Sequence, residues 1–200
     1  MQKQTVKIFI ASSGELATER EKMVVLLSEI NKQFPHLHLE PVKWETDLES
    51  GSYGQRVQDA INPLLDRSDL VVFLFYSKAG MFTVEEFERA RAQCKKAFFY
   101  FKTGFSPTST AQFEAYGAVV RLREALEKEN TGLFKEFSGV EKLENLLRHD
   151  LPLYLDATFP RPAGTPPPSV EPEQDLLADW PLPDDLGYPE HPFLGFERFR

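Results

Sequence analysis

Two neighbouring carboxylates follow the most apolar segment of the chain, and they are the first candidates for chemistry. The segment Asp69–Tyr76 reads DLVVFLFY, and Glu85 and Glu86 come shortly after it in a stretch of helical composition. A carboxylate near a strand end can contact a ribose, act as a nucleophile or stabilise an oxocarbenium-like state when a glycosidic bond breaks. Thr83 and Glu86 also have the spacing of a helix capping box, and acidic residues favour the first turn of a helix. Glu86 and Glu85 are therefore candidate catalytic residues, with a helix cap as the alternative.

Ser12 and Ser13 form a second candidate site. They follow the apolar run Val6–Ile10 and precede a segment of helical spacing. Free backbone N–H groups at a helix start can hold phosphate. The alternative is a plain cap and turn, since Ser12 and Glu15 fit a capping box and neither a GxGxxG motif nor a P-loop is present.

Four more residues lie where strands are expected to end. Tyr76, Ser77 and Lys78 follow the most apolar segment, and Trp44 closes the alternating segment 37–44. Lys78 can pair with a phosphate and Trp44 can stack on a base. A solvated loop lysine and a partly buried packing residue are the alternatives. We treat all four as candidate substrate-binding residues.

Metal and thiol chemistry have little support in the sequence. The four histidines are scattered, and no HExxH or CxxC motif is present. The single cysteine, Cys94, falls on the expected buried side of a helix, so we predict a core thiol. No metal and no cofactor are expected.

Composition narrows the class of protein. The chain has 200 residues, a hydrophobic fraction of 42% and a formal net charge of -8. No long basic run supports nucleic-acid binding, and no apolar stretch of about 18 residues predicts a membrane span. One cysteine and no signal-peptide pattern favour a reducing compartment, with the cytoplasm as the default.

Strands and helices alternate along the first 155 residues. Four strands are predicted by apolar, β-branched and alternating segments: 6–10, 37–44, 69–76 and 97–102. Helices are predicted by apolar spacing near 3.6 residues: after residue 14, at 55–65, at 83–95, at about 111–129 and at 140–150. This pattern predicts an α/β fold, a flavodoxin-like parallel sheet of four to five strands in the order 2-1-3-4 with helices on both faces. Pro41 suggests that the second strand lies at an edge.

The end of the chain has a different composition. Residues 156–190 are rich in proline and acidic side chains, which predicts an extended linker. The aromatic residues of 191–200 suggest the start of another folded unit.

Several segments together resemble a TIR-like family. They are VKIFIASSGELATERE, VKWE, INPLLDRSDLVVFLFYSKAG, FTVEEFERA, AFFYFKTG and GLFKEFSGVEKLENLLRHDL, in that order. The resemblance covers nearly all of residues 5–155. Members typically form the N-terminal domain of bacterial STAND or NACHT-type ATPases, and HPFLGFERF at residues 191–199 resembles the entry to such an ATPase, which this chain lacks.

The resemblance implies a function. TIR-like domains of bacterial defence systems commonly cleave NAD, with a glutamate at the start of the helix after the third strand on the ribose that carries nicotinamide. By position Glu86 matches that glutamate, and Glu85 is the near alternative. The implied function is an NAD glycohydrolase with NAD as substrate, activated by oligomerisation. A non-enzymatic self-association module and a nucleoside deoxyribosyltransferase-like glycosidase are the alternatives.

Overall fold

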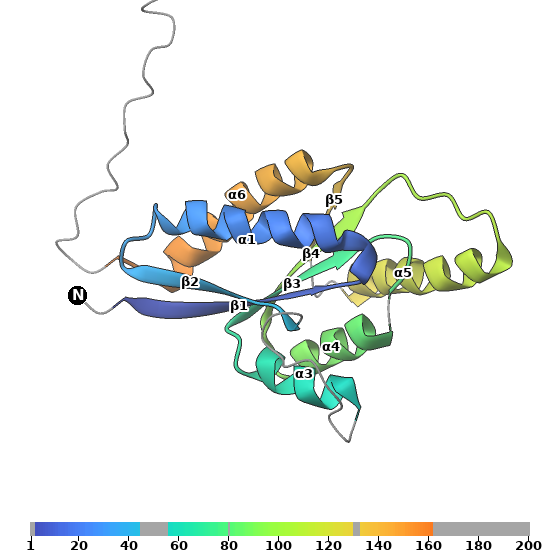
Figure 1. Cartoon of the computed structure of the whole chain (residues 1–200), viewed down its shortest axis with the longest axis horizontal. Coiled ribbons are helices and arrows are strands. Elements are labelled where there is room, and N and C mark those ends of the chain that lie inside the picture. The colour runs from blue at the N-terminus through green and yellow to red at the C-terminus, as the bar shows by residue number, and fades with distance from the viewer. Residues whose placement is uncertain (1–2, 45–55, 80, 130–132, 162–200) are drawn as a thin grey trace, which may run out of the picture. The chain divides into compact units, whose positions relative to one another are not determined.

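Five parallel strands form the centre of the domain (Figure 1). The computed structural model describes residues 3–44, 56–79, 81–129 and 133–161. The strands are β1 (Gln4–Ser12), β2 (Leu37–Val42), β3 (Leu70–Phe75), β4 (Lys96–Lys102) and β5 (Phe134–Phe137). The helices are the 3-10 turn η1 (Gly14–Leu16), α1 (Ala17–Asn31), α3 (Val57–Asp66), α4 (Met81–Ala92), α5 (Thr110–Glu129) and α6 (Val140–Thr158).

The strand order is β2-β1-β3-β4-β5, and every neighbouring pair is parallel. The predicted order 2-1-3-4 is therefore confirmed, and β5 extends the sheet. Only four residues long, with two charged side chains, β5 lacks an apolar pattern of its own. Its strand conformation comes from pairing with the end of β4, from Phe99 opposite Phe134 to Lys102 opposite Phe137.

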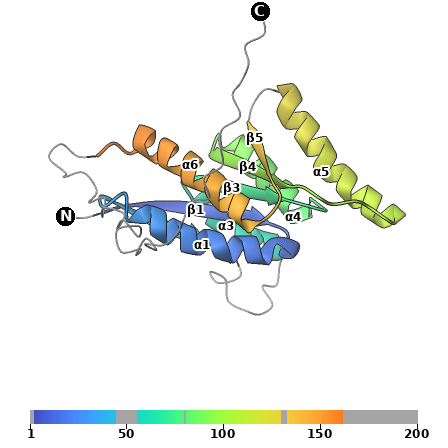
Figure 2. The ribbon, with the colours of Figure 1, turned by 90° about the horizontal axis from the view of Figure 1, so that it is seen from above.

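Helices cover both faces of the sheet (Figures 1 and 2). α1 and α6 lie side by side on one face, and α3, α4 and α5 belong to the other. Alternate residues of β1 follow this division: Ile8 and Ile10 pack with α1 and α6, whereas Phe9 and Ala11 face the second group of helices. The strand β3 is buried along its whole length, as a central parallel strand must be.

The edge position of β2 is also confirmed. β2 pairs with β1 alone, and Pro41 lies opposite Ile8 in that register. Proline lacks the N–H that a strand between two neighbours would donate, so an edge strand tolerates it.

The prediction that Cys94 is a core thiol is wrong. Cys94 is exposed, and its φ of 51° is the only positive φ of a non-glycine residue in the described part of the chain. The N–H of Lys95 donates to Ala90 O at 3.0 Å, and that of Cys94 donates to Arg91 O at 3.0 Å. This is a Schellman motif with Cys94 in the left-handed position, where the chain leaves α4.

Both capping-box predictions are also wrong. The turn η1 precedes α1, and Ser12 and Ser13 make no side-chain cap; Ser13 Oγ donates to the Glu15 carboxylate instead. At the other site, α4 starts at Met81, which places Thr83 inside the first turn rather than before it. Thr83 is buried there.

The last helix runs beyond its predicted end at residue 150. Leu143, Leu147, Leu151 and Leu155 recur every four residues and are all buried against the sheet, so α6 continues to Thr158 despite Pro152. The helix thus ends just past the predicted boundary at residue 155. The predicted linker (156–190) and following unit (191–200) fall almost entirely outside the described residues. No helix in the described ranges has the length and apolarity that crossing a membrane requires.

Candidate functional site

The loops that follow β1 and β3 are joined by one carboxylate. β1 and β3 are neighbours, with Ser12 opposite Leu74 at their carboxyl ends. Ser13 Oγ donates a hydrogen bond to Glu15 Oε1 at 2.9 Å, and the Ser77 N–H donates to the same oxygen at 3.1 Å. Ser77 Oγ donates to Glu15 Oε2. Two of the predicted substrate-binding residues, Ser13 and Ser77, are thus brought together through Glu15.

Ser12 lies in the same region but is held by a different group. Arg20 is 6% exposed, and its Nη1 donates to Ser12 Oγ. The same nitrogen lies 3.2 Å from Ser13 O and 3.5 Å from Ser12 O. Arg20 therefore donates to backbone carbonyl groups of the loop that follows β1.

Tyr76 contacts a second charged pair at this edge of the sheet. Lys102 Nζ lies 2.6 Å from Glu19 Oε1 and 4.9 Å from the centre of the Tyr76 ring. The Tyr76 ring also lies 5.7 Å from the ring of Phe105, edge to face. These contacts give Tyr76 a fixed place beside the ends of β3 and β4.

Glu85 and Glu86 have different surroundings. Glu85 forms an ion pair with Arg56, and its Oε1 accepts a hydrogen bond from Asn62 Nδ2 at 3.2 Å. The hydrogen bonds from Arg56 and Asn62 hold the pKa of Glu85 below its ordinary value. Asn62 belongs to α3, and Arg56 is the residue directly before that helix. Glu85 therefore links α4 to α3.

Glu86 lies inside the domain. It is only 4% exposed, and its turn of α4 also contains the buried Thr83 and Phe87. A carboxylate at such a place is much less screened by water than one at the surface. The two adjacent glutamates, indistinguishable by spacing, therefore differ in burial: the Glu85 side chain is 32% exposed.

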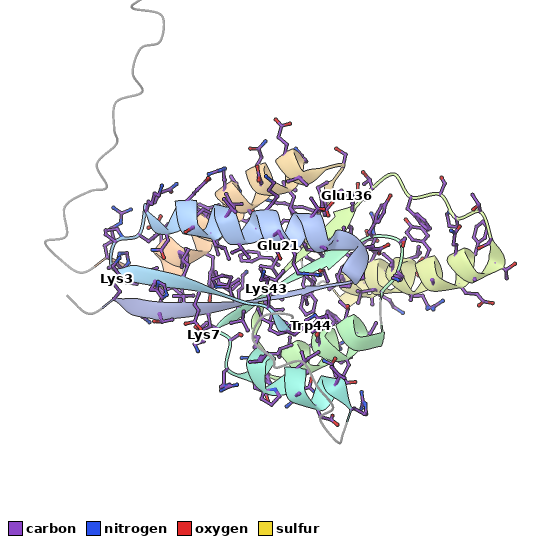
Figure 3. The ribbon with its side chains drawn as sticks, in the orientation of Figure 1. Lys3, Lys7, Glu21, Lys43, Trp44 and Glu136 are labelled. Atoms are coloured by element: carbon purple, nitrogen blue, oxygen red, sulfur yellow. The ribbon has the colours of Figure 1, made fainter. Side chains whose placement is uncertain are left out.

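Trp44 and Lys78 are both exposed. Trp44 is 38% exposed just beyond β2 (Figure 3), next to residues 45–55, which lie outside the described ranges. Its neighbour Lys43 is bonded to Glu21 of α1, with Lys43 Nζ 2.8 Å from Glu21 Oε1. This bond lowers the pKa of Glu21. Stacking by Trp44 and phosphate pairing by Lys78 stay predictions.

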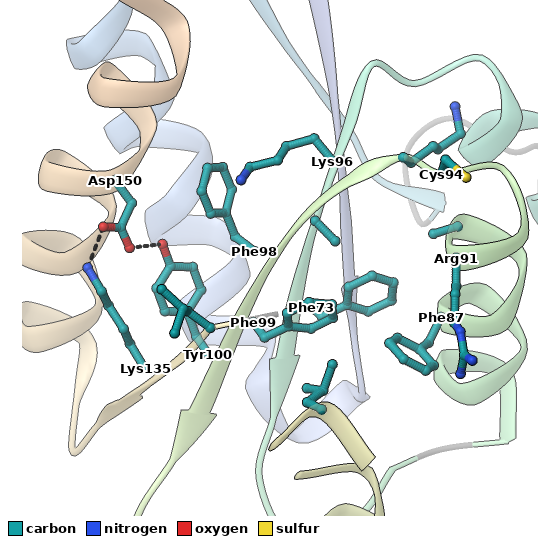
Figure 4. A pocket seen from close by; sticks show the side chains of 15 residues that line it. Phe73, Phe87, Arg91, Cys94, Lys96, Phe98, Phe99, Tyr100, Lys135 and Asp150 are labelled. Carbon is teal, nitrogen blue, oxygen red and sulfur yellow. Dashed lines mark hydrogen bonds and ion pairs between the residues drawn. The ribbon is translucent and has the colours of Figure 1, made fainter. Parts of the chain in front are cut away.

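A large cavity lies at the other end of the sheet (Figure 4). Its volume is about 910 Å³, and it surrounds the amino half of β4, where β5 has not yet begun. Tyr100 Oη donates to Asp150 Oδ2 at 2.8 Å, and Lys135 pairs with the same carboxylate. On β4 the cavity runs from Lys96 to Tyr100, so it opens at the amino end of this strand and stops two residues before Lys102. None of the predicted site residues lines it.

Sequence reasoning missed three residues of the carboxyl edge: Glu15, Arg20 and Lys102. Ser12 and Glu15 have the spacing of a capping box, which indicates a helix start rather than a contact of Glu15 with Ser77. Nothing near Arg20 in the sequence indicates that it meets the end of β1. Lys102 ends the predicted strand 97–102, but its pairing with Glu19 is not visible in the sequence. Among the described residues, no three histidine, cysteine or carboxylate side chains are grouped as a metal site would require.

The strand order and the helices on both faces define a flavodoxin-like α/β domain. No protein-family model matches the chain, and no curated protein matches it in sequence. Among solved structures it is similar to the translation elongation factor SelB from Methanococcus maripaludis in its apo form, with 15% identity and a TM-score of 0.43. That likeness covers 74% of this chain and 33% of the SelB chain, so the chain spans about a third of that protein's length. A similarity this remote says nothing about substrate or activity.

Proposed function

We propose that this chain contains a TIR-like effector domain that hydrolyses the nicotinamide–ribose bond of NAD when it is oligomerised. The observation that carries the proposal is the burial of Glu86 in the first turns of the helix that follows the central strand β3. Ligands of doubly wound sheets bind at the carboxyl ends of the strands, which is where α4 begins.

The proposed chemistry is the cleavage of one glycosidic bond. The bond between ribose C1′ and the nicotinamide nitrogen breaks, and its electron pair stays with nicotinamide, which leaves as a neutral molecule. Water adds to C1′ and loses a proton to solvent, so the other product is ADP-ribose. The Glu86 carboxylate stabilises the positive charge that develops on the ribose, an effect that is strongest where water is excluded.

Glu86 rather than Glu85 is the proposed catalytic carboxylate. Glu85 is engaged by Arg56 and Asn62, which gives it a structural role between α4 and α3. Ser12, Ser13, Ser77 and Lys78 would hold the dinucleotide, and Trp44 would stack on one of its rings. In a longer protein, a C-terminal STAND-type ATPase would bring such domains together, as expected of a cytoplasmic antiviral defence protein.

The test is the release of nicotinamide from NAD by the chain fused to a forced oligomer. Glu86→Gln should lower turnover at least about 100-fold, since that is the usual loss when one transition-state electrostatic contact is removed. Glu85→Gln is the matched control, because it makes the same change of charge on the adjacent residue. It should retain turnover within a few-fold of the unchanged chain.

Two outcomes would contradict the proposal. Equal turnover by the unchanged chain and both variants would remove Glu86 from the mechanism. No turnover even after enforced clustering would favour a non-enzymatic self-association module. A panel of nucleosides and dinucleotides in the same assay identifies the base that leaves.

A further inference from the structure

The hydrogen bonds of Glu15 with Ser13 and Ser77, here called the Glu15 bridge, lie at the switch point of the sheet. In the order β2-β1-β3-β4-β5, the chain moves from β1 to β2 on one side and then to β3 on the other. The crevice that binds ligands in such sheets therefore opens between the carboxyl ends of β1 and β3. Ser13 follows β1, Ser77 follows β3, and the Glu15 carboxylate spans the two. An anionic group of the protein itself thus occupies this crevice.

The groups around Glu15 are suited to a phosphate as well as to a carboxylate. Two hydroxyl groups, of Ser13 and Ser77, and the backbone N–H of Ser77 converge on its two oxygens. All three are donors in these bonds, and phosphate oxygens accept hydrogen bonds from the same kinds of group.

The bridge can open without disturbing the core. Glu15 is exposed and both serines are half-buried, so rotation of the Glu15 side chain breaks only surface hydrogen bonds. Such bonds are weak in net terms because water replaces them. An incoming anion can therefore displace Glu15, although the negative charge of Glu15 opposes its approach.

We propose that Glu15 is an internal competitor for an anion site formed by Ser13 and Ser77, and that the site binds the pyrophosphate of a dinucleotide. This inference rests on the proposed function and deepens it, because it names the group that the two serines recognise and the side chain that restricts access. Removing the charge of Glu15 weakens its hold on the donors, because a neutral oxygen accepts more weakly than a carboxylate, and ends the repulsion.

The test measures the Kd of inorganic pyrophosphate and of ADP-ribose for the chain by isothermal titration calorimetry. Neither probe contains the nicotinamide–ribose bond, so binding is measured without turnover. Glu15→Gln should tighten both about tenfold, which corresponds to about 1.4 kcal/mol. The matched control is Glu127→Gln, an equal change of charge at an exposed residue near the end of α5, at the opposite edge of the sheet. It should leave both Kd values within twofold of the unchanged chain.

A triple variant tests whether the hydroxyl groups of Ser13 and Ser77 donate to the bound anion. Adding Ser13→Ala and Ser77→Ala to Glu15→Gln should abolish most of the gain in affinity. The proposal is overturned if Glu15→Gln behaves like Glu127→Gln, if the gain survives loss of both hydroxyl groups, or if no variant binds either probe. Thermal unfolding of each variant verifies that it is folded.

The same variants separate this inference from the proposed function. Tighter binding by Glu15→Gln without any nicotinamide release supports the internal competitor and contradicts NAD hydrolysis. Nicotinamide release that depends on Glu86, with no change of affinity in Glu15→Gln, contradicts the internal competitor alone.

Discussion

Lys102 Nζ lies 2.6 Å from Glu19 Oε1, which joins the end of β4 to the first turn of α1. The side chain of Glu19 is 4% exposed and that of Lys102 is 23% exposed. The two residues are 83 positions apart, and the contact exists because the sheet brings the ends of β1, β3 and β4 into one row. A carboxylate so buried depends on its partner for compensation of its charge.

Replacing Lys102 by methionine should therefore destabilise the domain by about 3 kcal/mol, because Glu19 would be left buried without this cation. Chemical denaturation with urea measures the loss. The control is Lys7→Met, which breaks an ion pair with Glu40 at 3.3 Å in which both side chains are 41% exposed. That change should lower the free energy of unfolding by less than about 1 kcal/mol. Equal effects of the two substitutions would show that burial of Glu19 has no energetic role.

Cys94→Gly should stabilise the domain by about 0.5–1 kcal/mol. Cys94 has a φ of 51° at the end of α4, a conformation that strains any residue with a Cβ and that glycine adopts freely. Cys94→Ala is the control, because alanine keeps the Cβ and should bring no gain. Midpoints of thermal unfolding under reducing conditions compare the three chains, and a gain in Cys94→Ala as large as in Cys94→Gly would refute the explanation from backbone strain.

Asp66 should make stability depend on pH in the acid range. Its hydrogen bond from Arg89, with Arg89 Nε 2.7 Å from Oδ1, holds the pKa of Asp66 at about 2. Since the folded pKa lies below the unfolded one, the contribution is complete above about pH 4 and is lost as the pH falls towards 2. After allowance for screening of this half-exposed pair, about 1 kcal/mol is expected.

The measurement is the free energy of unfolding between pH 5 and pH 2. Asp66→Asn should flatten the decline relative to the unchanged chain. Asp59→Asn removes an exposed carboxylate from the same helix without altering the Arg89 pair, and it should keep the original slope. Identical slopes for Asp66→Asn and the unchanged chain would exclude Asp66 as a source of the pH dependence.

Tyr100→Phe should destabilise the domain by about 1.5–3 kcal/mol, as expected for a hydrogen bond to a charged group. The Tyr100 hydroxyl donates to Asp150 Oδ2 inside the wall of the cavity in Figure 4. Burial and the nearby Asp150 carboxylate raise the pKa of Tyr100, so the hydroxyl stays protonated. Tyr116→Phe, at a half-buried ring on α5, is the control and should have little effect on urea denaturation. A loss below about 0.5 kcal/mol for Tyr100→Phe would mean that Lys135 and His149 satisfy Asp150 without the hydroxyl group.

Local patterns were enough for most of the elements. The strand β3 was predictable because six consecutive apolar residues can be buried on both faces only at the centre of a parallel sheet. The edge position of β2 followed from the single residue Pro41. β5 was not predictable as a separate strand, because its four residues depend on hydrogen bonds to β4.

The errors arose where a local pattern had two interpretations. Ser12 and Glu15 have the spacing of a capping box, yet Glu15 bonds Ser77 because β3 lies next to β1. Cys94 has the helical spacing of a core residue, but α4 ends before it. The first error comes from a contact distant in sequence, and the second from the local hydrogen bonds that end α4.

By itself, the sequence determined the alternation of strands and helices, the parallel sheet and its order, because these follow from local periodicity and general rules of chain connection. It also determined that a glutamate pair follows the central strand. Only the tertiary structure decided which polar side chains meet: Glu15 with Ser13 and Ser77, Glu19 with Lys102, and Glu85 with Arg56. The physical reason is that each of these contacts needs two loops or helices to be brought together by packing of the sheet, which spacing along the chain does not encode.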